Sequence, residues 1–578
     1  MKLIFKYLKK YKKWVIIDII SVCSFALAEL GIPTLVANIV NVGIANNDTD
    51  YMFRMALIMV VLALLSTIGM IVLGYASSYI STSITRDIRN DMFIKTQSFS
   101  HAEYDKFGVS SLITRVGNDA FQVQQFINVL LRTAVMAPFM FVLSTFLILN
   151  TSLQLASVIA ITIPIIILGV VAIAHFSEPI SNAQQKSMDR LVKISRENIT
   201  GVRVIRSFTN DSYEDERFKK ESVIYANNCK KLYKLMNISQ PAFFLLLNLA
   251  SLPIFYISAN LINIQALQVG SLIAFMEYLF HAMFSIMLFS SVFIMYPRAA
   301  VSANRIEAVL YSPISIKNND EGIKEYSNDT NINLRFDNVS FYYPDSTNKV
   351  LSSISFNAKQ GETIAFIGST GSGKSTLIQL IPRFYDVSEG SIYINDININ
   401  DYDLNTLRSI IGYIPQKAKL FSGTISENIR FGKKEASYDE LIDSSRTAQA
   451  YDFINNKENK FDELLSEGGS NVSGGQKQRL SIARALIRKP SIYIFDDSFS
   501  ALDYKTDATL RSALKSETKD AITLIVAQRI SSIKDANRII VLNEGHIIGN
   551  GTHLDLLKNC PIYYEIAASQ LSEEELKR

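Results

Sequence analysis

The chain has 578 residues, 48% of them hydrophobic, and its 58 basic and 54 acidic residues leave a formal net charge of +4. A charge this small excludes the strongly basic surface of a nucleic-acid-binding protein, so we expect no nucleic-acid partner. Cys23, Cys229 and Cys560 are far apart and the five histidines are scattered, which excludes a disulfide framework and a metal-ligand cluster of these residues. The mean hydropathy of +0.16 conceals a division, because the apolar residues gather in the first half.

The N-terminal segment combines lysines with apolar side chains. Residues 1–13 predict a short amphipathic helix at a membrane surface, with Trp14 at the interface. The lysines, the apolar run and Ala26-Leu27-Ala28 also resemble a cleaved signal peptide. Cleavage would leave five membrane spans in place of six, so we expect the segment to be retained as a helix.

Apolar stretches long enough to cross a bilayer recur through the first half of the chain. We expect six spans, at residues 14–40, 55–82, 133–149, 152–174, 239–262 and 268–296. The loop near 43–51, the turn at 150–151 and residues 261–269 carry no Lys or Arg, whereas the long segments 83–132 and 175–238 carry many. The positive-inside rule therefore predicts that the long segments, both termini and the C-terminal half are cytosolic. Frequent Ile, Asn and Lys indicate an AT-rich bacterial genome, so we expect a multi-pass protein of a cytoplasmic membrane.

The two long segments are charged and poor in Gly and Pro, which favours helices that continue past the bilayer. Each helical pair should turn at a short crosswise helix, near Ser100–Phe107 and near Ser207–Asp215. The alternative is a solvated charged loop at each position.

Some ionisable residues fall inside the predicted spans, where they usually face an interior cavity. They are Asp18, Glu29, Glu277 and His281. Glu277 and His281 are four residues apart and share a helix face, which continues through Phe284, Leu288 and Met295. This face indicates either a large cavity for apolar or cationic compounds, or ordinary helix packing with one hydrogen bond.

Residues 311–331 are rich in Asn, Asp, Lys and Ser and predict a solvated connector. The alternating Ile332, Leu334 and Phe336 then predict a half-buried strand. We therefore expect a membrane domain at 1–310 and a cytosolic domain at 332–578.

The cytosolic half contains the pattern G-x-x-x-x-G-K-S at 368–375. The apolar run 363–367 before it predicts a buried strand, and the run 377–381 after it predicts a helix. This is the context in which a glycine-rich loop cradles phosphates with backbone N–H groups. Lys374 then reaches the terminal phosphates and the Ser375 hydroxyl binds Mg²⁺. The sequence thus predicts that the chain binds ATP.

Further motifs follow in a fixed order. They are Tyr343 after Phe341-Tyr342, Gln416 after Ile414-Pro415, Glu467-Gly468-Gly469, Val472-Ser473-Gly474-Gly475-Gln476, the apolar run 491–495 ending in Asp496, Ser500-Ala501-Leu502-Asp503 and Gly551-Thr552-His553. With the phosphate loop and the six spans, this series resembles one half of an ABC exporter over nearly the whole chain. The resemblance implies a polytopic α-helical membrane domain, with long cytosolic extensions, fused to an α/β ABC-type nucleotide-binding domain.

The resemblance also implies roles for the motif residues. Tyr343 stacks on adenine. The phosphate-binding residues are Gly368, Ser369, Thr370, Gly371, Ser372, Gly373, Lys374, Ser375 and Thr376, and the Mg²⁺-binding residues are Ser375, Gln416 and Asp496. The signature residues Ser473, Gly474, Gly475 and Gln476 form a second cradle, which in the family faces the ATP of another cassette. One chain then builds no complete site, so a second half-transporter is an expected partner.

The catalytic residues implied by the resemblance depart from the family at two positions. Asp497 stands where the family normally has a glutamate base, and Gln528 stands where it usually has a histidine; Gln416 is unchanged. A carboxylate one methylene shorter is displaced by about 1 Å, which can cost about a hundredfold in rate. Gln528 can donate hydrogen bonds but cannot carry the charge of an imidazolium.

This combination is typical of the degenerate subunit of a heterodimeric multidrug ABC exporter. The partner would supply the glutamate base and the histidine of the competent site, while this chain supplies Ser473–Gln476. We expect an ATP-driven transport ATPase that exports amphipathic or drug-like compounds. A slow homodimeric exporter, an importer of the same fold and an ATP-gated or regulatory membrane protein remain alternatives.

Overall fold

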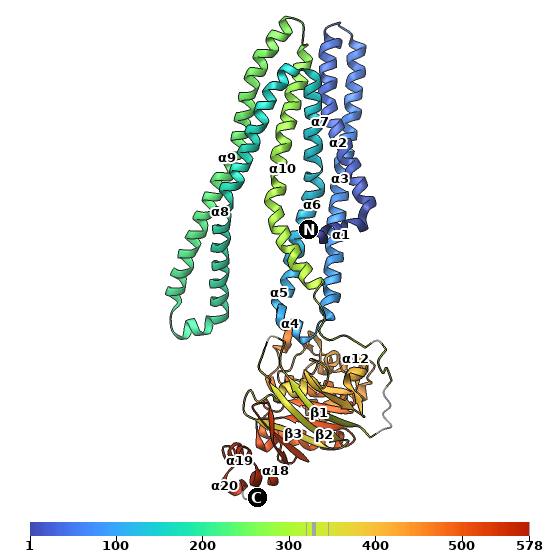
Figure 1. The fold of residues 1–578 in the computed structure, drawn as a ribbon, viewed down its shortest axis with the longest axis vertical. Coiled ribbons are helices and arrows are strands. Elements are labelled where there is room, and N and C mark those ends of the chain that lie inside the picture. The colour runs from blue at the N-terminus through green and yellow to red at the C-terminus, as the bar shows by residue number, and fades with distance from the viewer. Residues whose placement is uncertain (320, 326–330, 345, 577–578) are drawn as a thin grey trace. The chain divides into compact units, whose positions relative to one another are not determined.

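A computed structural model describes residues 1–319, 321–325, 331–344 and 346–576, drawn as a ribbon in Figure 1. The chain divides into two compact units. The first comprises residues 1–97 and 109–312, and the second comprises residues 98–108 and 313–578. The short segment 98–108 therefore belongs with the C-terminal unit, although it is inserted between helices of the first.

The first unit consists of helices and short turns. The α-helices are α1 (Lys2–Leu8), α2 (Lys12–Asn38), α3 (Thr49–Gln97), α5 (Val109–Thr114), α6 (Ala120–Val129), α7 (Met136–Thr151), α8 (Leu153–Ser207), α9 (Asp211–Asn263) and α10 (Val269–Leu310). A 3₁₀ turn lies between α1 and α2 at η1 (Lys9–Tyr11). Short π-helical segments continue the helices at η2 (Ile39–Ile44), η3 (Arg115–Asp119) and η4 (Leu130–Ala134). Within the described residues, six helical runs are long and apolar enough to cross a membrane, which confirms the six predicted spans.

Contacts between α2 and its neighbours hold this unit together. Gly69 of α3 lies so close to α2 that an added Cβ would be 3.3 Å from the Ser21 carbonyl oxygen. The hydroxyl groups of Thr34 and Tyr278 are 2.6 Å apart and join α2 to α10. At the start of α10, the Gly270 amide donates to Oδ1 of Asn41, which lies in η2 just after α2, at 2.7 Å.

Helices α8 and α9 form one long hairpin, drawn in green in Figure 1. The predicted crosswise helix at Ser207–Asp215 is wrong, because α8 ends at Ser207 and α9 begins at Asp211. Asp211 and Glu214 lie in the first turn of α9, where acidic side chains favour a helix N-terminus. The connection is therefore reduced to a three-residue turn.

The N-terminal helix α1 forms as predicted, but its apolar face is covered by protein. Leu3, Ile4 and Tyr7 are buried, and only Phe5 of its larger apolar residues is exposed. The Tyr7 hydroxyl donates to Asp91 Oδ2 at 2.5 Å, so α1 is held against α3. Part of the apolar face of α1 is therefore packed against protein, and its position at a membrane surface stays a prediction.

The second unit is an α/β domain with separate sheets. The strands are β1 (Asn333–Phe341), β2 (Leu351–Lys359), β3 (Thr363–Gly368), β4 (Glu389–Ile394), β5 (Ile397–Asn398), β6 (Ile411–Ile414), β7 (Gly423–Thr424), β8 (Leu464–Leu465), β9 (Ile492–Asp496), β10 (Ile522–Val526), β11 (Arg538–Asn543) and β12 (His546–Gly551). The larger sheet has the order β12-β11-β3-β10-β9-β6, with its strands parallel except β12. An antiparallel sheet has the order β2-β1-β4-β5, and β7 pairs with β8.

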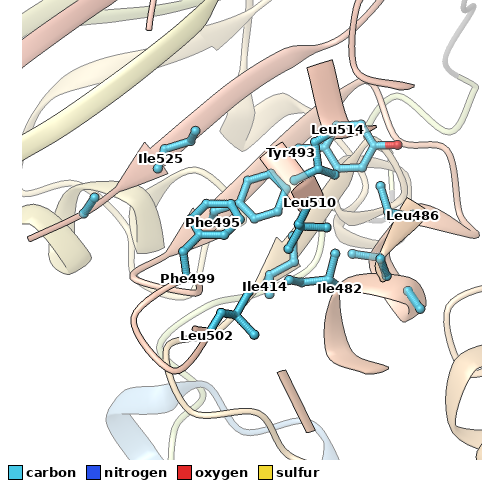
Figure 2. Packing of buried hydrophobic residues seen from close by; sticks show 14 of the residues in the cluster. Ile414, Ile482, Leu486, Tyr493, Phe495, Phe499, Leu502, Leu510, Leu514 and Ile525 are labelled. Atoms are coloured by element: carbon cyan, nitrogen blue, oxygen red, sulfur yellow. The ribbon is translucent and has the colours of Figure 1, made fainter. Parts of the chain in front are cut away.

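The helices of this unit accompany the two main sheets. They are α4 (His101–Phe107), α11 (Lys374–Leu380), α12 (Leu404–Ser409), α13 (Ile425–Arg430), α14 (Tyr438–Thr447), α15 (Tyr451–Asn455), α16 (Gly474–Leu486), α17 (Tyr504–Glu517), α18 (His553–Asn559), α19 (Pro561–Ala568) and α20 (Glu573–Leu576). Strands β9 and β10 are buried at every position, as expected of parallel strands covered on both faces. On one face Tyr493 and Phe495 pack with Ile414, Ile482 and Leu486, as Figure 2 shows.

The connector predicted at 311–331 falls partly on residues 320 and 326–330, which lie outside the described residues. Its described part is not wholly solvated. Ile316 is buried, and Ile323 forms a parallel bridge with Tyr402. Asn318 Nδ2 donates to Asp403 Oδ1 at 2.8 Å, so this part of the connector lies along the second unit.

Candidate nucleotide-binding site

The phosphate loop joins β3 to α11. Gly371 and Gly373 have φ angles of 85° and 97°, which glycine adopts without strain. A Cβ on Gly373 would lie 2.9 Å from the Val350 carbonyl oxygen, so a side chain has no room there. The loop leads directly into the N-terminus of α11, where backbone N–H groups lack intrahelical partners and favour an anion.

Lys374 is buried within this loop. Its ammonium donates to the carbonyl oxygens of Gly368 at 3.0 Å and Ser369 at 2.7 Å, and to the Ser372 hydroxyl at 3.2 Å. Burial lowers the pKa of Lys374, and the negative charges of Asp497 and Asp496 oppose that shift. The hydrogen bonds of the lysine are thus satisfied by its own loop in this structure.

Asp496 ends strand β9 and faces the loop. The Ser375 hydroxyl donates to Asp496 Oδ1 at 2.8 Å, and the Tyr413 hydroxyl donates to Asp496 Oδ2 at 3.0 Å. A serine hydroxyl beside an aspartate carboxylate is an oxygen donor set of the kind that Mg²⁺ prefers. The predicted metal residues Ser375 and Asp496 are therefore in direct contact.

Asp497 follows in a left-handed backbone conformation, with φ of 46°. Its Oδ2 accepts hydrogen bonds from Gln416 Nε2 at 3.0 Å and from Gln528 Nε2 at 2.9 Å. Burial raises the pKa of Asp497, the hydrogen bond from Gln416 opposes the shift, and neighbouring Asp496 adds to it. The structure thus brings the predicted catalytic residues together around one oxygen atom.

Lys374, Ser375, Asp497 and the two glutamines that donate to Asp497 line a cavity of about 390 Å³. Its lining comprises Tyr343, Val350, Thr370, Gly371, Gly373, Lys374, Ser375, Thr376, Gln416, Asp497, Val526 and Gln528. The Tyr343 hydroxyl is 3.0 Å from Thr376 Oγ1, which fixes the ring at the rim of the phosphate loop. Most predicted phosphate-loop residues and the predicted adenine-stacking tyrosine therefore meet at one cavity.

The signature segment forms a different structure. Ser473 caps α16, since the Gln476 amide donates to Ser473 Oγ at 3.3 Å and the Ser473 amide donates to Gln476 Oε1 at 2.9 Å. Ser473 and Gly474 are exposed. Among the described residues that line the cavity, none belongs to 473–476. The signature of this chain therefore presents a helix N-terminus away from its own phosphate loop.

Helix α4 packs within the second unit, and it confirms the short helix predicted near Ser100–Phe107. The ring of His101 stacks on Phe384 with centroids 4.6 Å apart. The Tyr385 hydroxyl donates to Asp105 Oδ2 at 3.1 Å. Phe384 and Tyr385 follow α11 in sequence, so α4 contacts the segment next to the phosphate-loop helix.

Sequence analysis missed Tyr413, which touches Asp496. The only local signal was its position three residues before Gln416, on a strand that also reads as ordinary packing. Val350 and Val526 were also missed, because short apolar residues carry no sign of a ligand.

Comparisons with known proteins agree with this architecture. Residues 15–287 match the family model of the ABC transporter transmembrane region, and residues 351–500 match the ABC transporter model. The chain is 36% identical to the uncharacterized ABC transporter ATP-binding protein YfiB of Bacillus subtilis, over 98% of both chains. It is 30% identical to the ATP-dependent lipid A-core flippase of Syntrophus aciditrophicus, over 86% of this chain and 82% of the relative.

Among solved structures, a bacterial Atm1-family ABC exporter with ATP bound superposes with a TM-score of 0.81, covering 97% of this chain and 99% of that one. At 23% identity this likeness supports the fold. The family matches and the relatives cover both units and identify the domain as one that binds nucleotide and drives transport. The chain is a membrane protein of the ABC transporter family, with one transmembrane region and one ATP-binding domain on the same polypeptide.

Proposed function

We propose that this chain is one half of a heterodimeric exporter and that its own ATP site hydrolyses slowly. The observation that carries the proposal is the position of Asp497, an aspartate whose Oδ2 is held by the amides of Gln416 and Gln528. A general base has to reach a water molecule and take its proton. The shorter side chain and the two amide donors keep this oxygen inside the site.

The remaining site residues support ATP binding. The phosphate loop offers backbone N–H groups and Lys374, while Tyr343 offers a ring at the rim of the cavity. The contact of Ser375 with Asp496 fits Mg²⁺, which would neutralise phosphate charge when bound. On this proposal the chain binds the nucleotide tightly and uses it mainly to hold two cassettes together.

The exposed signature completes the proposal. Ser473 and Gly474 lie at the N-terminus of α16, where an anion is stabilised by free N–H groups. This cradle would meet ATP held by the partner, whose glutamate base and histidine then hydrolyse it. The chain thus contributes a binding half-site to a competent site elsewhere.

The membrane unit supports an apolar or amphipathic substrate. A cavity of about 660 Å³ lies among α7, α8, α9 and α10. Its lining is mainly apolar and includes Phe141, Ile167, Val170, Met236, Met287 and Phe289. A relative is named as a lipid A-core flippase, which moves an amphipathic molecule. We therefore propose export of amphipathic or drug-like compounds across the cytoplasmic membrane, with the nucleotide-binding unit cytosolic.

ATP turnover of the purified chain in lipid, alone and together with a candidate second half-transporter, tests the heterodimer. We expect negligible turnover alone and brisk turnover in the pair. In the pair, Ser473→Ala should reduce turnover sharply and Asp497→Ala should change it little.

Ser437→Ala is the matched control, because Ser437 caps α14 with the same hydrogen-bond pattern that Ser473 uses on α16. It should leave turnover near the wild-type level. Brisk turnover of the lone chain that Asp497→Ala abolishes would instead identify a working base in a homodimer. Uptake into inverted proteoliposomes distinguishes the exporter from an importer or an ATP-gated protein.

A further inference from the structure

The register between β6 and β9 places Tyr413 on the same sheet face as the metal-binding aspartate. Tyr413 pairs with Ile494 in a parallel ladder, and Asp496 follows two residues later. Since side chains on a strand alternate between faces, Tyr413, Ile494 and Asp496 lie on one face. Ile414 and Phe495 lie on the opposite face, in the apolar cluster of Figure 2.

The Tyr413 hydroxyl donates its proton to Asp496 Oδ2 at 3.0 Å. This hydrogen bond joins β6 to the end of β9.

The two oxygens of Asp496 thus have different partners. Oδ1 accepts from Ser375, a residue that would share the metal, whereas Oδ2 accepts from Tyr413. Ligating carboxylates are commonly oriented by outer hydrogen bonds of this kind, and their loss typically lowers metal affinity about 10–100-fold.

The ring of Tyr413 is also held by aromatic contacts. Phe384 packs against it edge to face with centroids 5.3 Å apart, and Phe384 also stacks on His101 of α4. The tyrosine hydroxyl is therefore anchored in the same aromatic group that receives α4.

We propose that Tyr413 is a positioning residue that orients Asp496 for Mg²⁺ bound with ATP. The inference rests on the proposed nucleotide site, and it adds a residue that acts through the aspartate without touching nucleotide. A merely structural tyrosine would affect folding and leave metal affinity unchanged.

The test uses the full chain in lipid nanodiscs, with Mn²⁺ as a paramagnetic probe and ATP present. We expect Tyr413→Phe to weaken Mn²⁺ binding, measured by electron paramagnetic resonance, by about tenfold. Binding of a fluorescent ATP analogue in EDTA should be unchanged, because the phosphate loop and Tyr343 remain. Tyr493→Phe is the matched control, since it removes a hydroxyl from the neighbouring strand on the opposite face.

Equal Mn²⁺ affinity of wild-type and Tyr413→Phe chains would overturn the inference. A wild-type chain that binds neither Mn²⁺ nor the ATP analogue would instead overturn the proposed nucleotide site. The melting temperature in EDTA checks that each variant is folded. If Tyr413→Phe does not fold, Tyr413→Leu also lacks the hydroxyl, and Phe384→Leu, which removes the ring contact of Tyr413 but leaves its hydroxyl, is the control for the lost packing.

Discussion

Asp497 combines a left-handed backbone, partial burial and two amide donors on one oxygen. Its carboxylate also lies next to that of Asp496, so the ionised form is opposed by burial and by like charge. Strained backbone angles and shifted pKa values of this kind are common at functional sites.

Replacing Asp497 tests this balance. Its pKa in the folded chain lies above that of an unfolded aspartate, so the folded state binds the proton more tightly and stability falls as pH rises through this range. We expect Asp497→Asn to raise the melting temperature of the nucleotide-binding unit at neutral pH by up to roughly 2–4 °C. The gain should disappear as pH falls below the ordinary range of aspartate.

Asp503 provides the opposite control in the same thermal unfolding series. Backbone and side-chain hydrogen bonds from Thr506 hold the pKa of Asp503 below its usual range. Asp503→Asn should therefore lower the melting temperature at neutral pH. A lower melting temperature of Asp497→Asn at neutral pH would mean that the two amide hydrogen bonds to the carboxylate stabilise the fold more than the burial of its charge destabilises it.

At the level of single elements, α4 depends on Glu103. Its Oε2 accepts from the Ser100 amide at 2.8 Å and the Ser100 hydroxyl at 2.6 Å, while its Oε1 accepts from the Ser315 amide at 3.0 Å and from the Ser315 hydroxyl. Burial would raise the pKa of Glu103, but these hydrogen bonds outweigh it and the net shift is downward. One carboxylate therefore caps α4 and fastens it to the connector.

We expect Glu103→Ala to free α4, because both the cap and the contact with Ser315 disappear. Hydrogen exchange of the amides in 98–108 should accelerate by at least about tenfold, a change of about 1.4 kcal/mol in the local opening equilibrium. In the wild-type chain the same acceleration should develop as pH falls through the lowered pKa of Glu103, after correction for intrinsic exchange.

Glu440→Ala removes the equivalent carboxylate from the capping box of α14 and is the control. It should accelerate exchange only at the start of α14. Unchanged exchange in 98–108 of Glu103→Ala would mean that the aromatic contacts of α4 hold it without the carboxylate.

Local patterns explain which elements the sequence could predict. The start of α4 was predictable, because Ser100 and Glu103 form a capping box within four residues. The phosphate loop was predictable for the same reason, since its glycines and Lys374 are adjacent. The role of Tyr413 depends on pairing with a strand about 80 residues away, and the covering of α1 depends on packing against α3 and α10; neither leaves a local pattern.

For the whole molecule, the long helices expose apolar side chains that only lipid or other protein can cover. Leu153, Ile161 and Leu168 of α8 are 75%, 68% and 68% exposed. The number of spans was predictable, because hydropathy sums over many residues. The lengths of the helical extensions were harder to predict, because a charged helix and a charged loop have similar compositions.

Topology is tested by thiol labelling in a chain whose own cysteines have been replaced. We expect Asn46→Cys, between η2 and α3, to react with a membrane-impermeant maleimide added to intact cells. Asn210→Cys, between α8 and α9, should react only in inverted membrane vesicles. The reverse pattern would contradict the proposed cytosolic side.

The self-satisfied Lys374 has a consequence for the energetics of ligand capture. Because its ammonium is already bonded to Gly368, Ser369 and Ser372, an arriving phosphate exchanges one set of hydrogen bonds for another. The number of bonds changes little, and the gain comes from meeting a full negative charge in place of carbonyl dipoles. We therefore expect the loop to favour an anionic ligand over a neutral molecule of similar shape, because only the anion replaces the carbonyl dipoles with a full charge.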